Sequence, residues 1–359
     1  EIAPPAGVSQ IGDSPCCMLP DGRFLLGSFN GTATFLWDPA TGTWTPAAAK
    51  GDSGSEETWV LMADGTVVTP QCTDAPHAEK YLIASDQWQS AGTLTSNLVE
   101  AASLEIGPGL LLPDGRAFFI GASGGVTGLY SAASTSQWSG GPAIPPFGGQ
   151  AQGAKDGPAA LLPSGSVLFP VAPVDGTRNN YLSPCSLYEF DGASLIRTSD
   201  PPSAACPPYV SRLLLIPTGQ VLWAREDDDG VYAYTETGQP QGSYRPVVTL
   251  APTIVAAGGA TIVGGTQFNG LSQAVSYGDD YAAATNYPLV RIHNLASGHL
   301  RYCRTHDHAS NGVTSMGVAT GAAFVTTQVE LPGDLETGDS ELVVVANGIP
   351  SAPVQIKVR

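Results

Sequence analysis

Five short turns of similar sequence, spaced at nearly regular intervals, constrain the fold of this chain more than any other feature. Each turn follows a short apolar run and has the form Pro-Asp-Gly or a close variant. The spacings between successive turns are 43, 50, 50 and 54 residues, which is the length of a four-stranded propeller blade. We therefore infer one blade per turn. The five copies are Leu19-Pro20-Asp21-Gly22, Met62-Ala63-Asp64-Gly65, Leu112-Pro113-Asp114-Gly115, Leu162-Pro163-Ser164-Gly165 and Ile216-Pro217-Thr218-Gly219.

The residue types in these turns explain why the pattern repeats. Pro sets φ for the first central position of a tight turn, Asp or Ser bonds its own backbone, and Gly adopts the left-handed conformation that a Cβ disfavours. Apolar residues lie on both sides of each turn, which predicts a hairpin of two buried strands. Aromatic-rich segments such as Phe35-Leu36-Trp37 follow each hairpin. These are predicted to supply each blade's outer strands and to fill the space between adjacent blades.

The character of the chain changes near Ala251, where the turn repeat stops. The segment 243–248 is predicted to complete the outer strand of the fifth blade. Short alternating strands follow, such as Leu289–Ile292 and Leu342–Val345, and Val354–Val358 has the alternation of a half-buried closing strand. The sequence therefore predicts an all-β protein, with a β-propeller at residues 1–249 and an immunoglobulin-like β-sandwich at 250–359.

Composition narrows the class of partner. The chain has 43 Gly and 30 Pro among 359 residues, which suits a turn-rich, secreted or periplasmic all-β protein. A net charge of −17 with only 15 basic residues argues against nucleic acid or an anionic membrane surface as partner. No apolar run approaches the ~20 residues that span a bilayer. A neutral polymer such as a carbohydrate, a small neutral ligand or a cation is expected instead.

The cysteine pattern indicates disulfides more than metal binding. The chain has six cysteines and none forms a CxxC motif. Cys185 and Cys206 flank the irregular part of the fourth blade, where a disulfide would close an insertion. Either Cys16 or Cys17 could pair with Cys72, and a vicinal Cys16–Cys17 bond is the other possibility.

Aligning the five repeats on their turns places several acidic residues at equivalent positions, before the first strand of each hairpin. Counting back eight positions from the residue before each turn glycine gives Asp13, Glu56, Ile106, Asp156 and Val210. Acidic or basic residues lie beside several of these positions, Glu105 and Arg212 among them. Because the loops entering the inner strands converge on a propeller axis, the carboxylates are expected to face a common funnel.

Three interpretations of this funnel stay open. The acids could be solvated loop residues or partners of backbone N–H groups. With carbonyl oxygens, they could bind a hard cation such as Ca²⁺. Alternatively, two carboxylates could act as acid and base on a glycosidic bond. The candidate catalytic residues are Asp13, Glu56, Glu105, Asp156 and Arg212.

A second candidate site is the histidine-rich segment 301–308. If it is a strand, His306 and His308 point to the same side and Asp307 to the other. In a loop the two histidines could bind a transition metal, with a third ligand from the propeller. Alternatively, they pack the interface between the domains and bond to blade-loop carboxylates such as Glu105 or Asp156.

The chain resembles kelch-repeat proteins of the galactose oxidase-like superfamily, which join a propeller to a terminal immunoglobulin-like domain. The resemblance rests on the segments 156–163, 265–272, 305–308 and 343–351. The superfamily's copper enzymes use two Tyr and two His, and His306 matches one of these ligands. They also have seven blades, so N-terminal blades outside this chain would complete the ring if it does not close with five.

The resemblance also implies what this chain lacks. The Tyr-His dipeptide that supplies two copper ligands has no counterpart, since no His lies between His77 and His293. The copper site is therefore expected not to be retained. The resulting hypothesis is a carbohydrate-binding propeller, with a glycoside hydrolase or lyase as the alternative and a metal-dependent oxidase as a second alternative.

Overall fold

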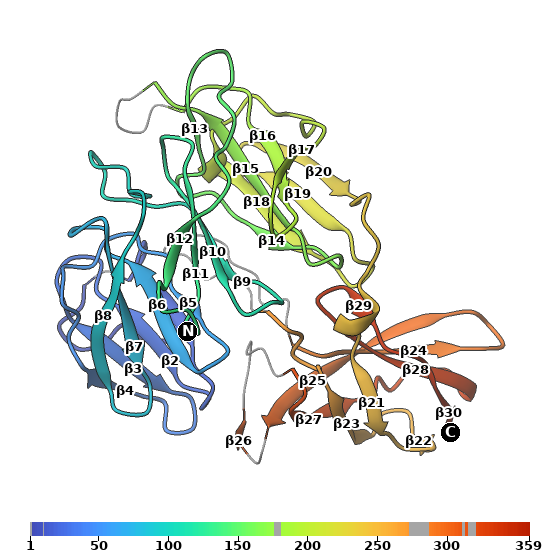
Figure 1. Ribbon diagram of the computed structural model, residues 1–359. Helices are drawn as coiled ribbons and strands as arrows, with labels where there is room; N and C mark the ends of the chain where they lie inside the picture. The colour runs from blue at the N-terminus through green and yellow to red at the C-terminus, as the bar shows by residue number, and fades with distance from the viewer. Residues whose placement is uncertain (1, 10, 176–180, 273–286, 311–312, 315–320) are drawn as a thin grey trace.

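The structure is a computed structural model that describes residues 2–9, 11–175, 181–272, 287–310, 313–314 and 321–359. Within these ranges the chain is all-β apart from two single-turn 3₁₀ helices, η1 (Pro208–Val210) and η2 (Gly242–Tyr244). Five sheets follow one another along the chain, and a larger sheet comes after them (Figure 1). None of the described helices has the length and apolar character needed to cross a membrane.

The first three blades are four-stranded antiparallel sheets whose strands pair in chain order. The first contains β1 (Cys16–Met18), β2 (Phe24–Gly27), β3 (Thr34–Asp38) and β4 (Thr43–Ala47). The second contains β5 (Val60–Leu61), β6 (Thr66–Pro70), β7 (His77–Leu82) and β8 (Gln87–Thr93). The third contains β9 (Gly109–Leu111), β10 (Ala117–Ile120), β11 (Thr127–Tyr130) and β12 (Trp138–Gly140).

The last two blades depart from this pattern. In the fourth, both β13 and β14 pair with β15. Its strands are β13 (Gln152–Gly153), β14 (Ala160–Leu161), β15 (Val167–Pro173), β16 (Ser186–Phe190) and β17 (Leu195–Arg197). The fifth has only three strands, β18 (Ser211–Leu215), β19 (Val221–Arg225) and β20 (Asp228–Tyr234). The expected five-bladed propeller is confirmed by this strand pairing.

The repeated turns have the chemistry expected of them. In all five, the glycine N–H donates to the carbonyl of the residue three positions earlier, at 2.8–3.0 Å. All five glycines have positive φ, between 83° and 92°. In the first three turns the Asp side chain also accepts a hydrogen bond from the backbone N–H two residues later. The turn residues are therefore selected by backbone geometry.

Adjacent blades pack through apolar side chains. One buried cluster joins the first and second blades, another the second to the fourth, and a third the fourth and fifth. Phe118 of the third blade stacks on Phe190 of the fourth, with ring centroids 4.0 Å apart, and meets Phe169 edge-on at 6.1 Å. The predicted filling of interblade space by aromatics is confirmed at this interface.

The C-terminal strands form a curled sheet compatible with a β-sandwich. The pairing order is β21-β23-β27-β25-β24-β28-β30-β22, with β26 and β29 attached to β25 and β28. The strands are β21 (Val247–Leu250), β22 (Ile254–Val255), β23 (Ala260–Thr266), β24 (Leu289–Asn294), β25 (Leu300–Ser310), β26 (Val313–Thr314), β27 (Phe324–Glu330), β28 (Gly338–Ala346), β29 (Ile349–Pro350) and β30 (Val354–Val358). The immunoglobulin-like assignment stays a prediction.

The expectation that residues 243–248 complete the fifth blade was wrong. Residues 242–244 form η2, and β21 pairs with β23 of the C-terminal sheet. Sequence alone gave no sign of this because Val247 and Val248 suit an outer strand of either sheet. The chain therefore passes into the C-terminal sheet a few residues earlier than the turn repeat indicates.

Candidate functional site

Three carboxylates from three different blades meet at one place. Glu56, Glu105 and Asp156 each lie in the connection that leads to an inner strand, β5, β9 and β14 respectively. One oxygen of each lies within 4.8 Å of one oxygen of each of the others. Glu105 is buried, and the other two are half-buried. We call this group the carboxylate cluster. It is the one set of three or more clustered metal-ligand side chains among the described residues.

Local backbone geometry positions two members of the cluster. Asp156 has a φ of 51°, in the left-handed region, and its N–H donates to the carbonyl of Ile106 at 3.2 Å. Glu105 and Glu100 form an isolated antiparallel bridge in which the Glu100 N–H donates to the Glu105 carbonyl at 2.8 Å. The first bond ties the fourth-blade connection to the third-blade connection next to Glu105, and the second folds the third-blade connection back on itself.

A buried lysine neutralises part of the cluster's charge. The Lys155 ammonium lies against Oε2 of Glu105, and only 1% of the Lys155 side chain is exposed. The ammonium also donates to Ser103 Oγ at 3.0 Å and lies 5.7 Å from the centroid of the Tyr181 ring. The ammonium therefore offsets the negative charge of Glu105 directly.

Two tyrosines border the cluster. The rings of Tyr181 and Tyr209 meet edge to face, with centroids 6.3 Å apart. Burial raises the pKa of both phenols, and the negative charges of Asp156 and Glu105 raise it further. Tyr181 donates its hydroxyl proton to the Ala122 carbonyl at 2.6 Å. The tyrosines therefore remain neutral and present aromatic rings beside charged oxygens.

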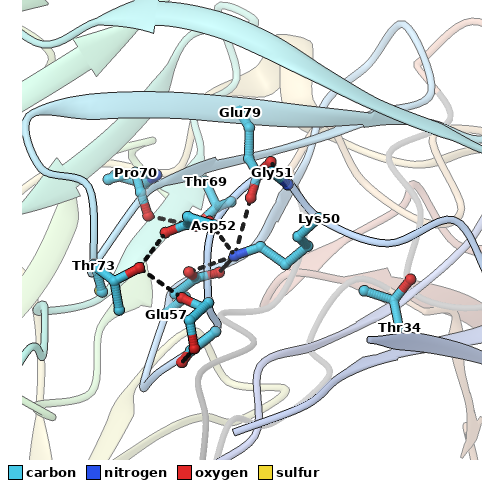
Figure 2. A network of polar contacts seen from close by, with 12 residues as sticks. Thr34, Lys50, Gly51, Asp52, Glu57, Thr69, Pro70, Thr73 and Glu79 are labelled. Atoms are coloured by element: carbon cyan, nitrogen blue, oxygen red, sulfur yellow. Dashed lines mark hydrogen bonds and ion pairs between the residues drawn. The ribbon is translucent and has the colours of Figure 1, made fainter. Parts of the chain in front are cut away.

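A second buried network holds the connection that carries Glu56. The Lys50 ammonium contacts both oxygens of Glu57 at 2.5 Å, and contacts Asp52 and Glu79 at 3.1 Å each (Figure 2). All four side chains are at most 5% exposed. Since Glu57 directly follows Glu56, this Lys50 network fixes the backbone from which Glu56 extends.

The Lys50 network carries more negative than positive charge. Burial raises the pKa of Glu79 to about 7, and a hydrogen bond shared with Asp52 raises it as well, although Lys50 acts in the opposite direction. Burial alone would raise the pKa of Asp52 too, but Lys50 holds it below its usual value. Asp52 and Glu79 therefore share one proton near neutral pH, as close carboxyl pairs do.

The structure brings together Glu56, Glu105 and Asp156, whereas the other two candidates have different surroundings. Asp13 occupies the same register in the first blade and has a φ of 58°, but it lies outside the carboxylate cluster. Arg212 donates to the carbonyls of Tyr209 and Ser211 at 2.8 Å and lies 3.7 Å from Glu226. Arg212 thus supports the backbone of Tyr209. The catalytic roles of these residues stay predictions.

The expected arrangement of His306 and His308 was wrong. Asp307 has a φ of 49° and β25 has a bulge between His306 and Ala309, which breaks the alternation of a regular strand. His306 is half-exposed and lies 2.8 Å from Asp307 and 3.4 Å from Glu330. The expected bonds to Glu105 or Asp156 are replaced by these neighbours in its own sheet.

His308 lies inside the C-terminal sheet. Its Nδ1 is 3.0 Å from Thr327 Oγ1, and its ring stacks on Tyr287 at 6.0 Å. Burial lowers its pKa to about 4, and the nearby His306 lowers it further. A neutral, packed imidazole of this kind is a core residue.

The atoms of the carboxylate cluster that could bind a metal ion are all carboxylate oxygens. Such a set suits a hard cation such as Ca²⁺ and does not suit copper, which favours imidazole and thiolate ligands. The Lys155 ammonium already occupies Glu105, where a divalent ion would compete with it. For these reasons we assign no chemical step to a metal.

Sequence reasoning missed the tyrosines and the Lys50 network. Tyr181 lies in the long connection between β15 and β16, and Tyr209 lies in η1, so neither shares the turn-based register. Lys155, beside Asp156, was visible in the alignment, but its burial was not. A lysine directly before the aligned acidic position of the fourth repeat is the signal that could have identified Lys155 as an ion-pair partner.

Comparison with known proteins assigns no family to this chain. No family model and no curated protein matches the sequence. Among solved structures, the chain is similar to a novel fungal alcohol oxidase of the AA5 family in complex with copper. The TM-score is 0.41 and the identity 13%, over 97% of this chain and 85% of the other. It is also similar to the Kuenenia stuttgartiensis hydrazine synthase, with a TM-score of 0.38 and 13% identity over 63% and 60% of the two chains. Similarity this low assigns neither an activity nor a copper ion to this chain.

Proposed function

We propose that this propeller binds a neutral carbohydrate at the carboxylate cluster, and that the protein works outside the cytoplasm. The observation that carries the proposal is the convergence of Glu56, Glu105 and Asp156 from three blades within 4.8 Å. Carboxylates accept strong hydrogen bonds from hydroxyl groups, and each carboxylate has about four acceptor positions. A sugar supplies several hydroxyl donors on one rigid ring, which matches a compact set of acceptors.

The tyrosines and the overall charge support the same class of ligand. Tyr181 and Tyr209 place apolar ring surface next to the acceptors, and sugar recognition needs both apolar contact and polar groups. A net charge of −17 disfavours anionic polymers by simple repulsion. A neutral glycan avoids that cost and still donates hydrogen bonds to the cluster.

The test is a binding measurement with matched variants. A screen of neutral oligosaccharides identifies a ligand, and calorimetric titration then compares the wild type with Glu56→Gln and Asp156→Asn. Hydrogen bonds to a charged group are worth about 1.5–3 kcal/mol, so each variant should lose roughly tenfold or more in affinity. Asp339→Asn, which removes an exposed charge from the C-terminal sheet, should leave the affinity unchanged. Unchanged affinity in both cluster variants would refute the proposal.

A glycoside hydrolase is a second candidate, favoured by the carboxylate spacing. Retaining enzymes place their two carboxyl groups about 5–5.5 Å apart, whereas inverting enzymes need about 6.5–9.5 Å for a water molecule. Oxygens within 4.8 Å of one another lie below the inverting range and therefore favour the retaining arrangement. If the protein hydrolyses an aryl glycoside, NMR of the first product should therefore show retained anomeric configuration. An inverted product would exclude this pairing of carboxylates.

A further inference from the structure

The Lys50 network holds an amine and a carboxyl group at reacting distance in a place that water does not reach. The Lys50 ammonium lies 2.5 Å from both oxygens of Glu57, which places Nζ about 3 Å from the carboxyl carbon Cδ, the separation of a near-attack conformer (Figure 2). The Lys50 side chain is 1% exposed and the Glu57 side chain 0%. A primary amine held against a carboxyl carbon in this way can form an amide bond with it.

A buried tryptophan is placed to stabilise the charge that such a reaction creates. The Trp59 Nε1–H donates to Oε2 of Glu57 at 2.9 Å, and Trp59 is completely buried. When an amine adds to a carboxyl carbon, negative charge develops on the carboxyl oxygens, and a fixed donor in a water-excluded site stabilises that charge. The Trp59 indole therefore has the position of an oxyanion donor.

Two further carboxyl groups can carry the protons of the amine. Asp52 and Glu79 each lie 3.1 Å from Lys50 Nζ. Burial acts to lower the pKa of Lys50, but the surrounding carboxylates raise it above its usual value, so the amine is free only while a neighbour holds its proton. Glu79, with a pKa of about 7, takes up and releases a proton near neutral pH. The reaction is therefore slow, but each molecule needs to complete it only once.

We propose that Lys50 and Glu57 form an intramolecular isopeptide bond after the chain folds. Nζ attacks Cδ of Glu57, a C–N bond forms, and the C–Oε1 bond breaks. Two of the three ammonium protons pass through Asp52 and Glu79 to the departing Oε1, which leaves as water, so no oxidant or other reactant is needed. The neutral amide replaces a buried ion pair, whose two charges are costly to keep away from water. Loss of both charges favours the bond in this interior.

The bond closes a ring over residues 50–57, which include Glu56 of the carboxylate cluster. The connection that leads to β5 is then fixed covalently at both of its ends. Asp52 and Glu79 remain as a carboxyl pair that shares one proton. The proposal does not depend on the proposed carbohydrate function, because the ring forms whether or not the cluster binds a sugar.

Mass spectrometry of the folded, full-length chain tests the bond directly. After reduction, the intact mass should be one water molecule below the mass calculated from the sequence. Trypsin cleaves after free Lys and Arg, and residues 24–80 contain a basic residue only at Lys50 and Lys80. The denatured wild type should therefore yield one peptide, 24–80, that has lost one water. The Lys50→Arg chain should yield peptides 24–50 and 51–80 at full mass. Tandem fragmentation should place the bond at Glu57.

Refolding tests the role of Trp59. A chain synthesised and purified in urea should have the full mass and should lose one water only after it refolds. Trp59→Phe, with its folding verified by circular dichroism, should lose the water about 10²-fold more slowly, the effect of removing one oxyanion donor. Trp138→Phe, which removes another buried indole donor, one that bonds to the Ala91 carbonyl, should not slow the loss.

Three results would each overturn the proposal. The first is a folded wild type of full mass that trypsin cleaves after Lys50. The second is a bond from Lys50 to Asp52 or Glu79 in place of Glu57. The third is an unchanged rate of water loss in Trp59→Phe.

Discussion

The ammonium of Lys155 and the carboxylate of Glu105 form an ion pair that is almost completely removed from solvent and joins the third and fourth blades. The ion pair positions two members of the carboxylate cluster, because Glu105 is one partner and Asp156 directly follows the other. It also lies beside Tyr181, over whose ring the ammonium is placed. The pair therefore connects propeller packing to the geometry of the proposed binding site.

Removing Lys155 should be strongly destabilising. Lys155→Met leaves the Glu105 carboxylate buried without its partner, and breaking a buried pair in this way costs about 3 to 5 kcal/mol. Urea unfolding measures the loss, with Lys357→Met at an exposed site as the control. Lys155→Met/Glu105→Gln should recover a large part of the stability, because no uncompensated charge remains. A double variant as unstable as Lys155→Met would contradict the ion-pair account.

The Lys50 network should make stability depend on pH. Glu79 has a pKa of about 7 in the folded protein against 4.5 ordinarily, so the native state keeps a proton that the unfolded chain loses. Its contribution to stability is full below pH 4.5 and is lost as the pH rises through about 7. The other charged members of the network are Lys50, Asp52 and Glu57.

Glu79→Gln isolates this effect. Its stability relative to the wild type should rise as the pH increases from 5 to 8, measured by urea unfolding at each pH. His308, with a pKa of about 4, produces the opposite trend below pH 6.5 in both proteins and cancels in the difference. Asp339→Asn should show a difference that does not change with pH. A flat difference for Glu79→Gln would show that no proton is shared in the network.

Cys185 and Cys206 should form a disulfide under oxidising conditions. Both thiols are buried in one apolar cluster, and the Cys185 thiol donates a hydrogen bond to the Cys206 sulfur. Oxidation by glutathione disulfide would form one S–S bond, with two electrons and two protons passing to glutathione. Thiol titration of the unfolded, oxidised protein should then find at least two fewer than the six cysteines. All six titrating would contradict the pairing.

Two glycine variants separate backbone strain from contact between the domains. Gly115 has a φ of 88° and a Cβ there would meet no atom within 4 Å, so Gly115→Ala should cost roughly 1–2 kcal/mol from strain alone. At Gly219, with a φ of 83°, a Cβ would lie 3.1 Å from Pro163 and 3.3 Å from the Gly348 carbonyl. Gly219→Ala should therefore cost more than Gly115→Ala in urea unfolding. Equal losses would mean that the contact with Gly348 adapts freely.

Local chemistry made the propeller predictable from sequence. The turn at Asp21-Gly22 needs a positive φ and an Asp that bonds its own backbone, and such requirements recur wherever the same hairpin recurs. The same register placed Glu56 and Asp156 at equivalent positions and Glu105 one residue before the equivalent position of the third repeat. Their convergence followed from the symmetry of the repeat.

Features without local signals were not predictable. Val247–Leu250 pairs with β23. The choice between β23 and the fifth blade depends on long-range contacts, which the sequence of the segment does not indicate. The bulge at Asp307 depends on pairing with β27, so the alternation around His306 gave the wrong faces. The ion pair of Lys50 with Glu79 joins the connection before β5 to β7, and neither segment alone indicates it.

The most direct test of the central claim is a crystal structure of the protein with the oligosaccharide found in the binding screen. We predict a sugar ring at the carboxylate cluster, with its hydroxyls donating to Glu56, Glu105 or Asp156 and one face against Tyr181 or Tyr209. A sugar bound elsewhere on the propeller, with no contact to these carboxylates, would contradict it.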